Sequence, residues 1–479
     1  MNCLYEAVIG LEVHAELKSE TKIFCACRTR FGAEPNTQCC PVCLGLPGAL
    51  PVLNRRVVEL AVIAGLALDC EISMCSRTDR KQYFYPDLPK GYQISQAQAP
   101  ICRNGHLTVM TEDGGERCVR IERIHIEEDA GKLIHEGNET LVDCNRCGVP
   151  LIEIVSCPDL RSGAEAAAYL KALRGVLLAC GVSDCRMQEG SLRCDVNVSV
   201  RHRGDETFGV RTEIKNINSF AFVEKAIAYE TSRQIDILER GETIIAETRR
   251  YDATRGETVR MRVKETSEDY RYLAEPDLLP IRLGDDDIAR FRAQIPELPS
   301  ARAERLIREY GISVENARIL VGDLKMADFF EVGAKQTGYP KLLVNLLLSE
   351  LLRYCENDPF ASPVRAERLA ELADLLGERT VNSATGKKVL SRMLAADLSP
   401  RKVAIDEGLT QVTDAETIEA WVEDAVTALP RAVDDYRRGK SAAIKSLQGK
   451  VMALSGGRAD PVICEELLLI RLKKEVENT

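Results

Sequence analysis

The chain has 479 residues, 45% of them hydrophobic, and a formal net charge of −10 at pH 7. This length predicts two or more domains, because a single hydrophobic core stops growing beyond about 250–300 residues. The negative charge argues against attraction of the whole surface to nucleic acid but leaves room for a local basic patch. The sequence predicts no signal peptide and no membrane span. We therefore expect a cytoplasmic protein without a membrane partner and with reduced cysteines.

The first predicted strand covers residues 7–17 and carries Glu12 and His14 in an otherwise apolar run. Because side chains alternate along a strand, Glu12, His14 and Glu16 should share one face. A buried carboxylate is costly unless a cation, a metal or strong hydrogen-bond donors hold it. One such strand is weak support for a site, but four later segments repeat the pattern.

Four cysteines at the spacing of metal ligands follow this strand, Cys25 and Cys27 as one pair and Cys40 and Cys43 as the other. Four thiolates suit a tetrahedral structural zinc ion. Free buried cysteines and an iron–sulfur cluster are the alternatives. Because the protein supplies all four ligands of such a zinc site, we expect the ion to stabilise the loop and not to take part in catalysis.

Residues 79–95 form a predicted loop in which three tyrosines and one phenylalanine accompany Arg80, Lys81 and Lys90. Such a loop could stack a nucleic-acid base and hold phosphates. A loop that caps a hydrophobic core is an equally good explanation.

The four further charged strands are predicted at residues 123–129, 150–155, 191–200 and 210–216. They carry the charged or polar residues Glu127, Glu128, Asp129, Glu153, Arg193, Asp195, Asn197, Ser199, Arg211, Glu213 and Lys215. The last two strands are joined by a polar loop with two glycines, which predicts a hairpin. A solvated outer face with ordinary cross-strand ion pairs would explain most segments taken singly. It explains Glu153 least well, because that residue stands alone among apolar neighbours.

If the five strands share a sheet, one face carries carboxylates that repel one another unless divalent cations neutralise them. Oxygen ligands with one imidazole suit magnesium or manganese, and such sites commonly hold the phosphates of a nucleotide. Neither glycine-rich phosphate-binding signature, G-x-x-x-x-G-K-[ST] or G-x-G-x-x-G, is present. Bound phosphates would therefore depend on metal ions and not on a glycine-rich helix start.

The expected fold class is α+β with three domains. A mixed-sheet domain covers residues 1–293 and contains helices at 162–180 and 219–239. After a proline-rich boundary, an all-helical domain covers 294–405 and a small helical tail covers 406–479. The tail gathers basic residues although the chain is acidic, which suggests a polyanion contact, whereas solvated helix surface is the commoner origin of such residues. They are Lys440, Lys445, Lys450, Arg458, Arg471, Lys473 and Lys474.

Taken together, these motifs resemble the family of aspartyl/glutamyl-tRNA amidotransferase B subunits. The resemblance covers nearly the whole chain and is carried by residues 8–14, 25–54, 79–95, 125–132, 150–156, 189–195, 213–216, 248–250 and 269–272. It implies an N-terminal cradle similar to the glutamine synthetase catalytic fold. It also implies an ATP-dependent carbon–nitrogen ligase that phosphorylates the side-chain carboxylate of Glu-tRNA(Gln) or Asp-tRNA(Asn). Ammonia from a separate glutaminase (amidase) subunit would then give the amide, with a small third subunit as a further partner and the helical domains gripping tRNA.

The resemblance implies roles for particular residues. The expected phosphoryl-transfer set is Glu12, His14, Glu127, Glu128, Glu153, Asp195 and Glu213. Of these, the expected magnesium ligands are Glu12, His14, Glu128, Glu153, Asp195 and Glu213. Lys81, Arg193 and Lys215 are candidates for nucleotide or acyl-phosphate oxygens, and Cys25, Cys27, Cys40 and Cys43 match the family's zinc positions. Two other functions stay open: a tRNA-binding scaffold without catalysis, and a free-standing metal-dependent ligase or kinase of a small carboxylate.

Overall fold

The computed structural model describes residues 4–111, 114–263, 270–355 and 358–477. It divides into two compact units, residues 1–299 and 300–479. This division falls within the proline-rich stretch of the sequence. Asp269, which is part of one of the family motifs, lies outside the described residues. In the described part of the chain, no helix is long and apolar enough to cross a membrane.

The first unit is built on a nine-stranded sheet of strand order β14-β13-β12-β11-β1-β10-β7-β6-β2. Its strands are β1 (Tyr5–Glu16), β2 (Glu71–Ile72), β6 (Cys102–Met110), β7 (Glu116–Glu128), β10 (Pro150–Ser156), β11 (Leu192–His202), β12 (Thr212–Ile217), β13 (Glu247–Asp252) and β14 (Glu257–Val263). Neighbouring described strands pair antiparallel, except for the parallel pair β12–β13. The predicted mixed sheet and the predicted β11–β12 hairpin are thus confirmed.

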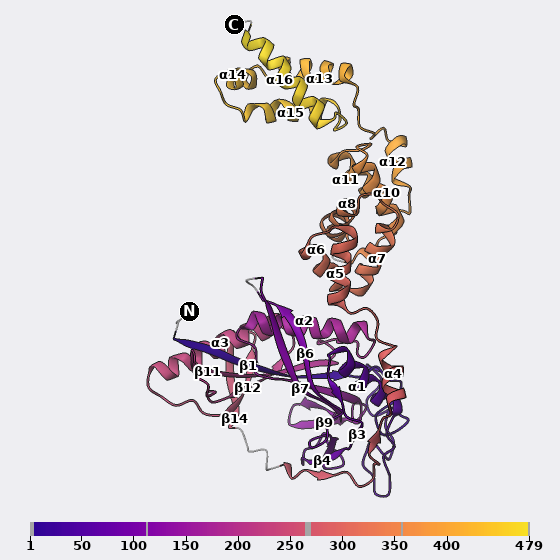
Figure 1. Cartoon of the computed structure of the whole chain (residues 1–479), viewed down its shortest axis with the longest axis vertical. Coiled ribbons are helices and arrows are strands. Elements are labelled where there is room, and N and C mark those ends of the chain that lie inside the picture. The colour runs from indigo at the N-terminus through magenta and orange to yellow at the C-terminus, as the bar shows by residue number, and fades with distance from the viewer. Residues whose placement is uncertain (1–3, 112–113, 264–269, 356–357, 478–479) are drawn as a thin grey trace. The chain divides into compact units, whose positions relative to one another are not determined.

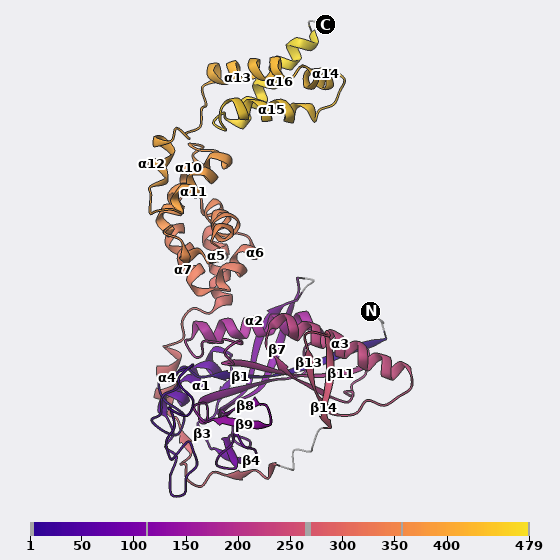
Figure 2. The ribbon, with the colours of Figure 1, turned by 180° about the vertical axis from the view of Figure 1, so that it is seen from behind.

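Three helices cover one face of this sheet: α1 (Arg55–Ala67), α2 (Gly163–Ala179) and α3 (Phe220–Glu239). Helices α2 and α3 lie on the same side of the sheet in both views (Figures 1 and 2). They begin where predicted, because Ser162 and Ser219 cap them by accepting hydrogen bonds from backbone N–H groups. On β1, the apolar side chains of Ile9, Leu11 and Val13 are at most 1% exposed in this core. The alternate side chains of β1 therefore face the opposite, polar side.

Small sheets lie on that opposite side (Figures 1 and 2). The stretch 79–95, predicted as a loop, is a hairpin in which β4 (Asp79–Gln82) and β5 (Tyr92–Ser95) pair antiparallel and residues 83–91 form the loop between them. Strand β15 (Leu273–Ala274) adds to β4. Two further small sheets are the hairpin of β8 (Lys132–Glu136) with β9 (Glu139–Asp143) and the short pair of β3 (Cys75–Ser76) with β16 (Ile281–Arg282). Helix α4 (Asp285–Arg292) ends the described elements of this unit.

The second unit is helical in its described residues and has two separate hydrophobic clusters. The first cluster draws on residues from Ala303 to Leu409 and the second on residues from Ile418 to Leu472. The two clusters separate between Leu409 and Ile418, after the expected boundary at 405/406, which stays a prediction. The elements are α5 (Pro299–Tyr310), α6 (Val314–Val321), α7 (Leu324–Ala334), α8 (Pro340–Asn345), the π-helical turn η2 (Leu346–Leu351), α9 (Leu352–Tyr354), the 3₁₀ turn η3 (Pro359–Ala361), α10 (Ala366–Gly377), α11 (Ser383–Met393), α12 (Pro400–Asp406), α13 (Ala415–Ala428), α14 (Pro430–Arg437), α15 (Ala443–Leu454) and α16 (Pro461–Glu477).

A buried ionic network ties α3 to strands β13 and β14. Glu230 of α3 is fully buried, and its carboxylate lies 2.6 Å from Arg233 Nη2 and 3.5 Å from Arg249 Nε. Thr258 Oγ1 also donates to Glu230, at 2.9 Å. Arg249 also forms an ion pair with Glu247, whose side chain is 1% exposed. Because a buried charge is tolerated only when it is paired, this network fixes β13 against the helix.

Replacing Glu230 by glutamine should lower the free energy of unfolding by about 3–5 kcal/mol, because Arg233 and Arg249 each lose one of their two buried carboxylate partners. Burial would raise the pKa of Glu230, but hydrogen bonds from Arg233 and Gln234 outweigh it and lower this pKa from the ordinary 4.5. The charged form therefore stabilises the fold above about pH 5 and loses its effect as the pH falls through the lowered pKa. Urea unfolding of the wild type and of Glu230→Gln from pH 8 to pH 3 measures the difference between their free energies of unfolding. The difference should shrink in acid, and Glu224→Gln at an exposed position of α3 should change little. An equal difference at all pH values would contradict the assignment.

Candidate active site

The polar face of the large sheet brings together the predicted residues of β1, β7, β10, β11 and β12. The register places Glu12 opposite Asp195, and His14 between Arg193 and Glu153. Two groups of carboxylate and imidazole ligand atoms result, and within each the atoms lie within 4.8 Å of one another. We call them the His14 cluster (His14, Glu127 and Glu153) and the Glu12 cluster (Glu12, Asp195 and Glu213).

In the His14 cluster, the imidazole lies between two carboxylates. His14 Nε2 is 3.3 Å from Glu153 Oε2 and 3.4 Å from Glu127 Oε1. Burial would lower the pKa of His14, but the hydrogen bond to Glu153 and the charge of Glu127 raise it. Burial would likewise raise the pKa of Glu153, yet His125 and His14 hold it well below its usual range. Despite burial, the hydrogen bond with His125 and the charge of His14 also lower the pKa of Glu127, so both carboxylates are ionised and can serve as ligands.

His125 is a member of this site to which the sequence analysis gave no role. Its Nε2 lies 3.4 Å from Glu153 Oε2 and 3.8 Å from Glu127 Oε2, and the residue is 4% exposed. Despite burial, the charges of these carboxylates raise the pKa of His125 to about 9. The signal was present in the sequence, because His125 and Glu127 are two apart on one strand and must share its face.

The Glu12 cluster has one lysine and two neutral donors around it. Lys215 Nζ lies 2.6 Å from Asp195 Oδ2 and 3.4 Å from Glu213 Oε1. Asn197 Nδ2 donates a hydrogen bond to Glu12 Oε1 at 3.1 Å. Thr248 Oγ1 of β13 donates one to Glu213 Oε2 at 2.9 Å. Burial and the charges of Glu153, Glu213 and Asp195 raise the pKa of Glu12. This repulsion, together with the oxygen-rich donor set, fits a hard divalent cation such as magnesium.

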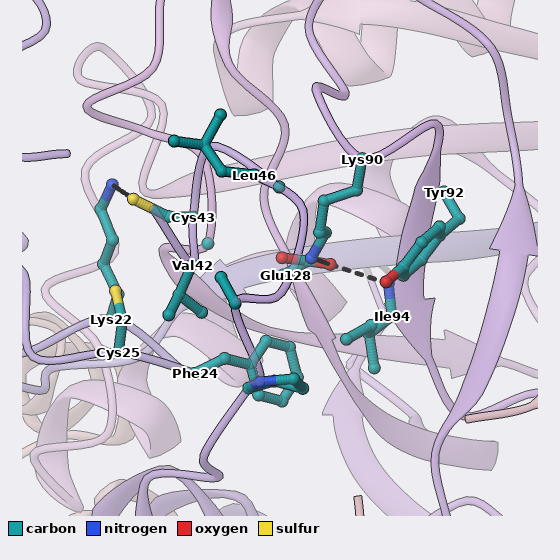
Figure 3. Close-up of a pocket in the computed structure, with 14 residues that line it drawn as sticks. Lys22, Phe24, Cys25, Val42, Cys43, Leu46, Lys90, Tyr92, Ile94 and Glu128 are labelled. Carbon is teal, nitrogen blue, oxygen red and sulfur yellow. Dashed lines mark hydrogen bonds and ion pairs between the residues drawn. The ribbon is translucent and has the colours of Figure 1, made fainter. Parts of the chain in front are cut away.

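Glu128 must be removed from the predicted magnesium ligands. As the neighbour of Glu127 on β7 it points to the other face, because successive side chains of a strand alternate. Its carboxylate accepts a hydrogen bond from the backbone N–H of Ile94 at 2.9 Å and pairs with Lys90. Figure 3 shows Glu128 against both residues, in a cavity of about 130 Å³. It is Glu127 that lies with His14 and Glu153.

The three predicted cations line one cavity of about 380 Å³ together with His14 and Asp195, and we call it the Lys81 cavity. Arg193 is engaged by Asp129 at 2.7 Å, and Lys215 by the Glu12 cluster. Lys81 forms no ion pair with the described residues, and its Nζ lies 4.9 Å from the centre of the Tyr270 ring. Lys81 is therefore the best placed of the three to meet an incoming anion.

The predicted cysteine quartet also converges, with the Sγ atoms of Cys25, Cys27, Cys40 and Cys43 within 4.8 Å of one another. Lys22 is fully buried beside it, with Nζ 3.5 Å from Cys43 Sγ (Figure 3). The same Nζ lies 3.1 Å from the carbonyl oxygen of Cys144. A buried ammonium needs an anionic partner, and here a thiolate supplies it. A hydrogen bond with Cys25 lowers the pKa of Cys43 to about 4. The quartet therefore suits a closed tetrahedral zinc site.

Clustered carboxylates with histidines, lysines and tyrosines around them define the catalytic domain of an enzyme that handles anions. Comparison with known proteins makes this specific. The GatB/GatE catalytic domain model matches residues 7–289, and the GatB domain model matches residues 328–472. The chain is 48% identical over 478 residues to the aspartyl/glutamyl-tRNA(Asn/Gln) amidotransferase B subunit of Carboxydothermus hydrogenoformans, covering 98% of this chain and 99% of that protein. It is 50% identical over 472 residues to the protein of the same name from Chlorobium phaeobacteroides, covering 98% and 99%.

The chain belongs to the family of aspartyl/glutamyl-tRNA(Asn/Gln) amidotransferase B subunits. The match spans nearly its full length, so both the sheet unit and the helical unit are family features.

Purified protein should contain about one zinc ion per chain, and Cys43→Ser should lose most of it, because the closed site needs four thiolates. Metal analysis and titration of the thiols before and after chelation measure both effects. Cys118→Ser, at an exposed cysteine outside the quartet, is the matched control and should retain zinc. Equal zinc content in the wild type and in Cys43→Ser would remove the proposed site.

Proposed function

We propose that this chain is the catalytic component of a tRNA-dependent amidotransferase. It uses ATP to phosphorylate the side-chain carboxylate of Glu-tRNA(Gln) or Asp-tRNA(Asn), and ammonia then converts the acyl phosphate to the amide. The observation that carries the proposal is the pair of carboxylate clusters on one sheet face, beside a cavity that offers Lys81. The sheet unit would correspond to a cradle similar to the glutamine synthetase catalytic fold.

A carboxylate is a poor acyl electrophile, and phosphorylation gives it a leaving group. In the first step a side-chain oxygen of the aminoacyl group attacks the γ-phosphorus of ATP, and ADP leaves. In the second step ammonia attacks the acyl carbon, phosphate leaves, and the nitrogen loses a proton. The His14 and Glu12 clusters would hold magnesium, which when bound spreads the charge of the transferring phosphoryl group.

The residues of the chain itself orient and balance the reacting groups. Lys81 would approach the transferring phosphoryl oxygens, because it is the lysine of the cavity that forms no ion pair with a described carboxylate. Lys215 keeps Asp195 and Glu213 in place, and His125 does so for Glu153. Charged groups that are positioned before the substrate arrives need little reorganisation during the reaction.

The partners follow from the family as proposals. A glutaminase subunit would supply ammonia, a small third subunit would complete a heterotrimer, and a misacylated tRNA would bring the substrate. A scaffold without catalysis is disfavoured, because it would have no need to keep two partly buried carboxylate clusters whose members repel one another. A free-standing ligase of a small carboxylate is disfavoured by the match of the helical unit to the family.

With the glutaminase and the small third subunit present, Glu153→Gln and Asp195→Asn should each lower ATP-dependent conversion of Glu-tRNA(Gln) by at least about 100-fold, because each removes a charged ligand from one cluster. Formation of Gln-tRNA and release of ADP are the measurements. Binding of tRNA should stay within twofold. Glu6→Gln is the matched control, since Glu6 lies on the same face of β1 but pairs with Arg201 away from the clusters. Near-normal turnover in both cluster variants would refute the metal-binding role.

The tail is proposed as a tRNA contact. Lys440 and Arg471 are engaged by Asp435 and Glu423. Lys445 and Lys450 on α15 form no ion pair with any carboxylate that the structure describes. The side chain of Lys474 lies outside the described residues. Unpaired lysines gain most from a phosphate, because no protein partner has to be displaced.

Reversing both charges, Lys445→Glu with Lys450→Glu, should weaken tRNA binding about tenfold and flatten its salt dependence, because phosphate contacts release counterions. Filter binding between 50 and 200 mM salt measures this. Truncation after Leu409 keeps the first helical cluster whole and should have the larger effect. Lys225→Glu, at an exposed lysine of α3, is the charge control. Unchanged affinity in both tail variants would reject the tail as a tRNA contact.

A further inference from the structure

A turn at residues 143–147 contacts both the loop that carries the cysteine quartet and the wall of the Lys81 cavity. It begins at the end of β9 and leads to β10. The backbone N–H of Cys147 closes it by donating to the carbonyl oxygen of Cys144 at 3.1 Å. We call it the Arg146 turn, after the residue that reaches the cavity wall. None of the transfer steps described above uses this turn.

The quartet loop, residues 25–43, holds one side of the turn. Asn36 Oδ1 accepts a hydrogen bond from the backbone N–H of Cys144 at 2.8 Å. The backbone N–H of Gln38 donates to Asn145 Oδ1 at 2.7 Å. Both contacts come from the segment between the two cysteine pairs, so they depend on how the four cysteines close the loop.

The quartet also reaches the turn through a buried lysine. Lys22 Nζ lies 3.5 Å from Cys43 Sγ and donates to the carbonyl oxygen of Cys144 at 3.1 Å. The quartet loop contains no helix or strand, and sheet pairing therefore does not fix its conformation. Four thiolates that share a metal ion would supply the missing constraint.

The other side of the turn holds the wall of the Lys81 cavity. Arg146 Nε and Nη2 donate to the carbonyl oxygens of Ala130 and Gly131, at 2.8 Å and 2.7 Å. The same Nε lies 3.6 Å from Asp129 Oδ2, which is 2.7 Å from Arg193 Nη2. Three of these residues, Asp129, Ala130 and Arg193, line the cavity. Because a guanidinium is a rigid fork, it fixes both carbonyl groups in one orientation.

The segment held by Arg146 lies just beyond the end of β7, where sheet pairing has stopped. Two of its backbone N–H groups are hydrogen-bonded, that of Asp129 to the carbonyl oxygen of Val149 and that of Gly131 to the carbonyl oxygen of Asp87, both at 2.8 Å. Hydrogen bonds of this kind protect an amide from exchange with solvent as long as the segment stays closed. Their protection therefore reports how firmly the cavity wall is held.

We propose that the quartet loop positions Asp129 and Arg193 through the Arg146 turn, so that metal binding by the cysteines sets the shape of the Lys81 cavity. Arg146 is then a positioning residue, which acts through Asp129 and not on a substrate. With the quartet closed, Arg193 meets an incoming anion in one orientation. With the quartet open, the turn loosens and the cavity wall moves with it. The proposal goes beyond the proposed function, because no step of the transfer requires a link between the cysteines and the reacting groups.

Hydrogen exchange of the zinc-loaded complete complex, read by mass spectrometry, tests the link without requiring turnover. Removal of zinc by a chelator should speed exchange of the peptide that covers residues 129–131 about tenfold, and Arg146→Ala should do the same with zinc present. Chelation of Arg146→Ala should add little, because both changes break the same connection, whereas the effects of independent sites add. Exchange of strand β6 should stay unchanged. A complex that takes up no zinc overturns the proposal together with the zinc site.

Asn36→Gly cuts the link while sparing the cysteines. Asn36 is exposed and has φ +59°, which glycine adopts without strain. The variant should keep its zinc, speed exchange at residues 129–131, and lower kcat about fivefold, because Arg193 is less well oriented. Asn104→Gly is the matched control, since Asn104 is also exposed, has φ +54° and contacts Glu71 instead of the turn. It should leave exchange at residues 129–131 and kcat unchanged.

Arg146→Lys separates position from charge. Lysine keeps a cation beside Asp129 but cannot present the same fork to two carbonyl groups, so its exchange should resemble that of Arg146→Ala. Wild-type exchange and turnover in Arg146→Lys would show that charge alone matters and overturn the proposal. Additive effects of chelation and Arg146→Ala, or unchanged exchange in Asn36→Gly, overturn it too. If the exchange follows the expected pattern but the complex consumes no ATP, the link stands and the proposed function is wrong.

Discussion

Like charges gathered on one face of a largely antiparallel sheet are the constraint on which the site depends. Glu12, Glu153, Asp195 and Glu213 come from four adjacent strands, and their repulsion is only partly relieved by the histidines and Lys215. Strand β1 serves both clusters, because Glu12 and His14 are two residues apart and so share a face at a spacing of about 7 Å. The central position of β1 thus sets the distance between the two ligand groups.

Such a charged face requires a rigid support on the other side of the sheet. The apolar side chains of β1 are buried under the helices, and the Glu230 network fixes β13 against α3. On the opposite face of β13, Thr248 donates a hydrogen bond to Glu213 Oε2 at 2.9 Å. Alternation along β13 therefore joins a structural network on one face to a ligand on the other. The repulsion among the crowded carboxylates is therefore offset by packing on the other face of the sheet, which makes no contact with them.

Strand alternation predicted much of the site, and its limits are equally physical. Every predicted ligand inside a regular strand, such as Glu153, reaches the expected face. Glu128 was misplaced because three consecutive acids at a strand end carry no alternation that selects one of them. Residues 79–95 were predicted as a loop because prolines and a glycine interrupt two short strands. Lys22 could not be found in advance, because nothing in its local sequence indicates that a distant part of the chain, at Cys144, folds over it.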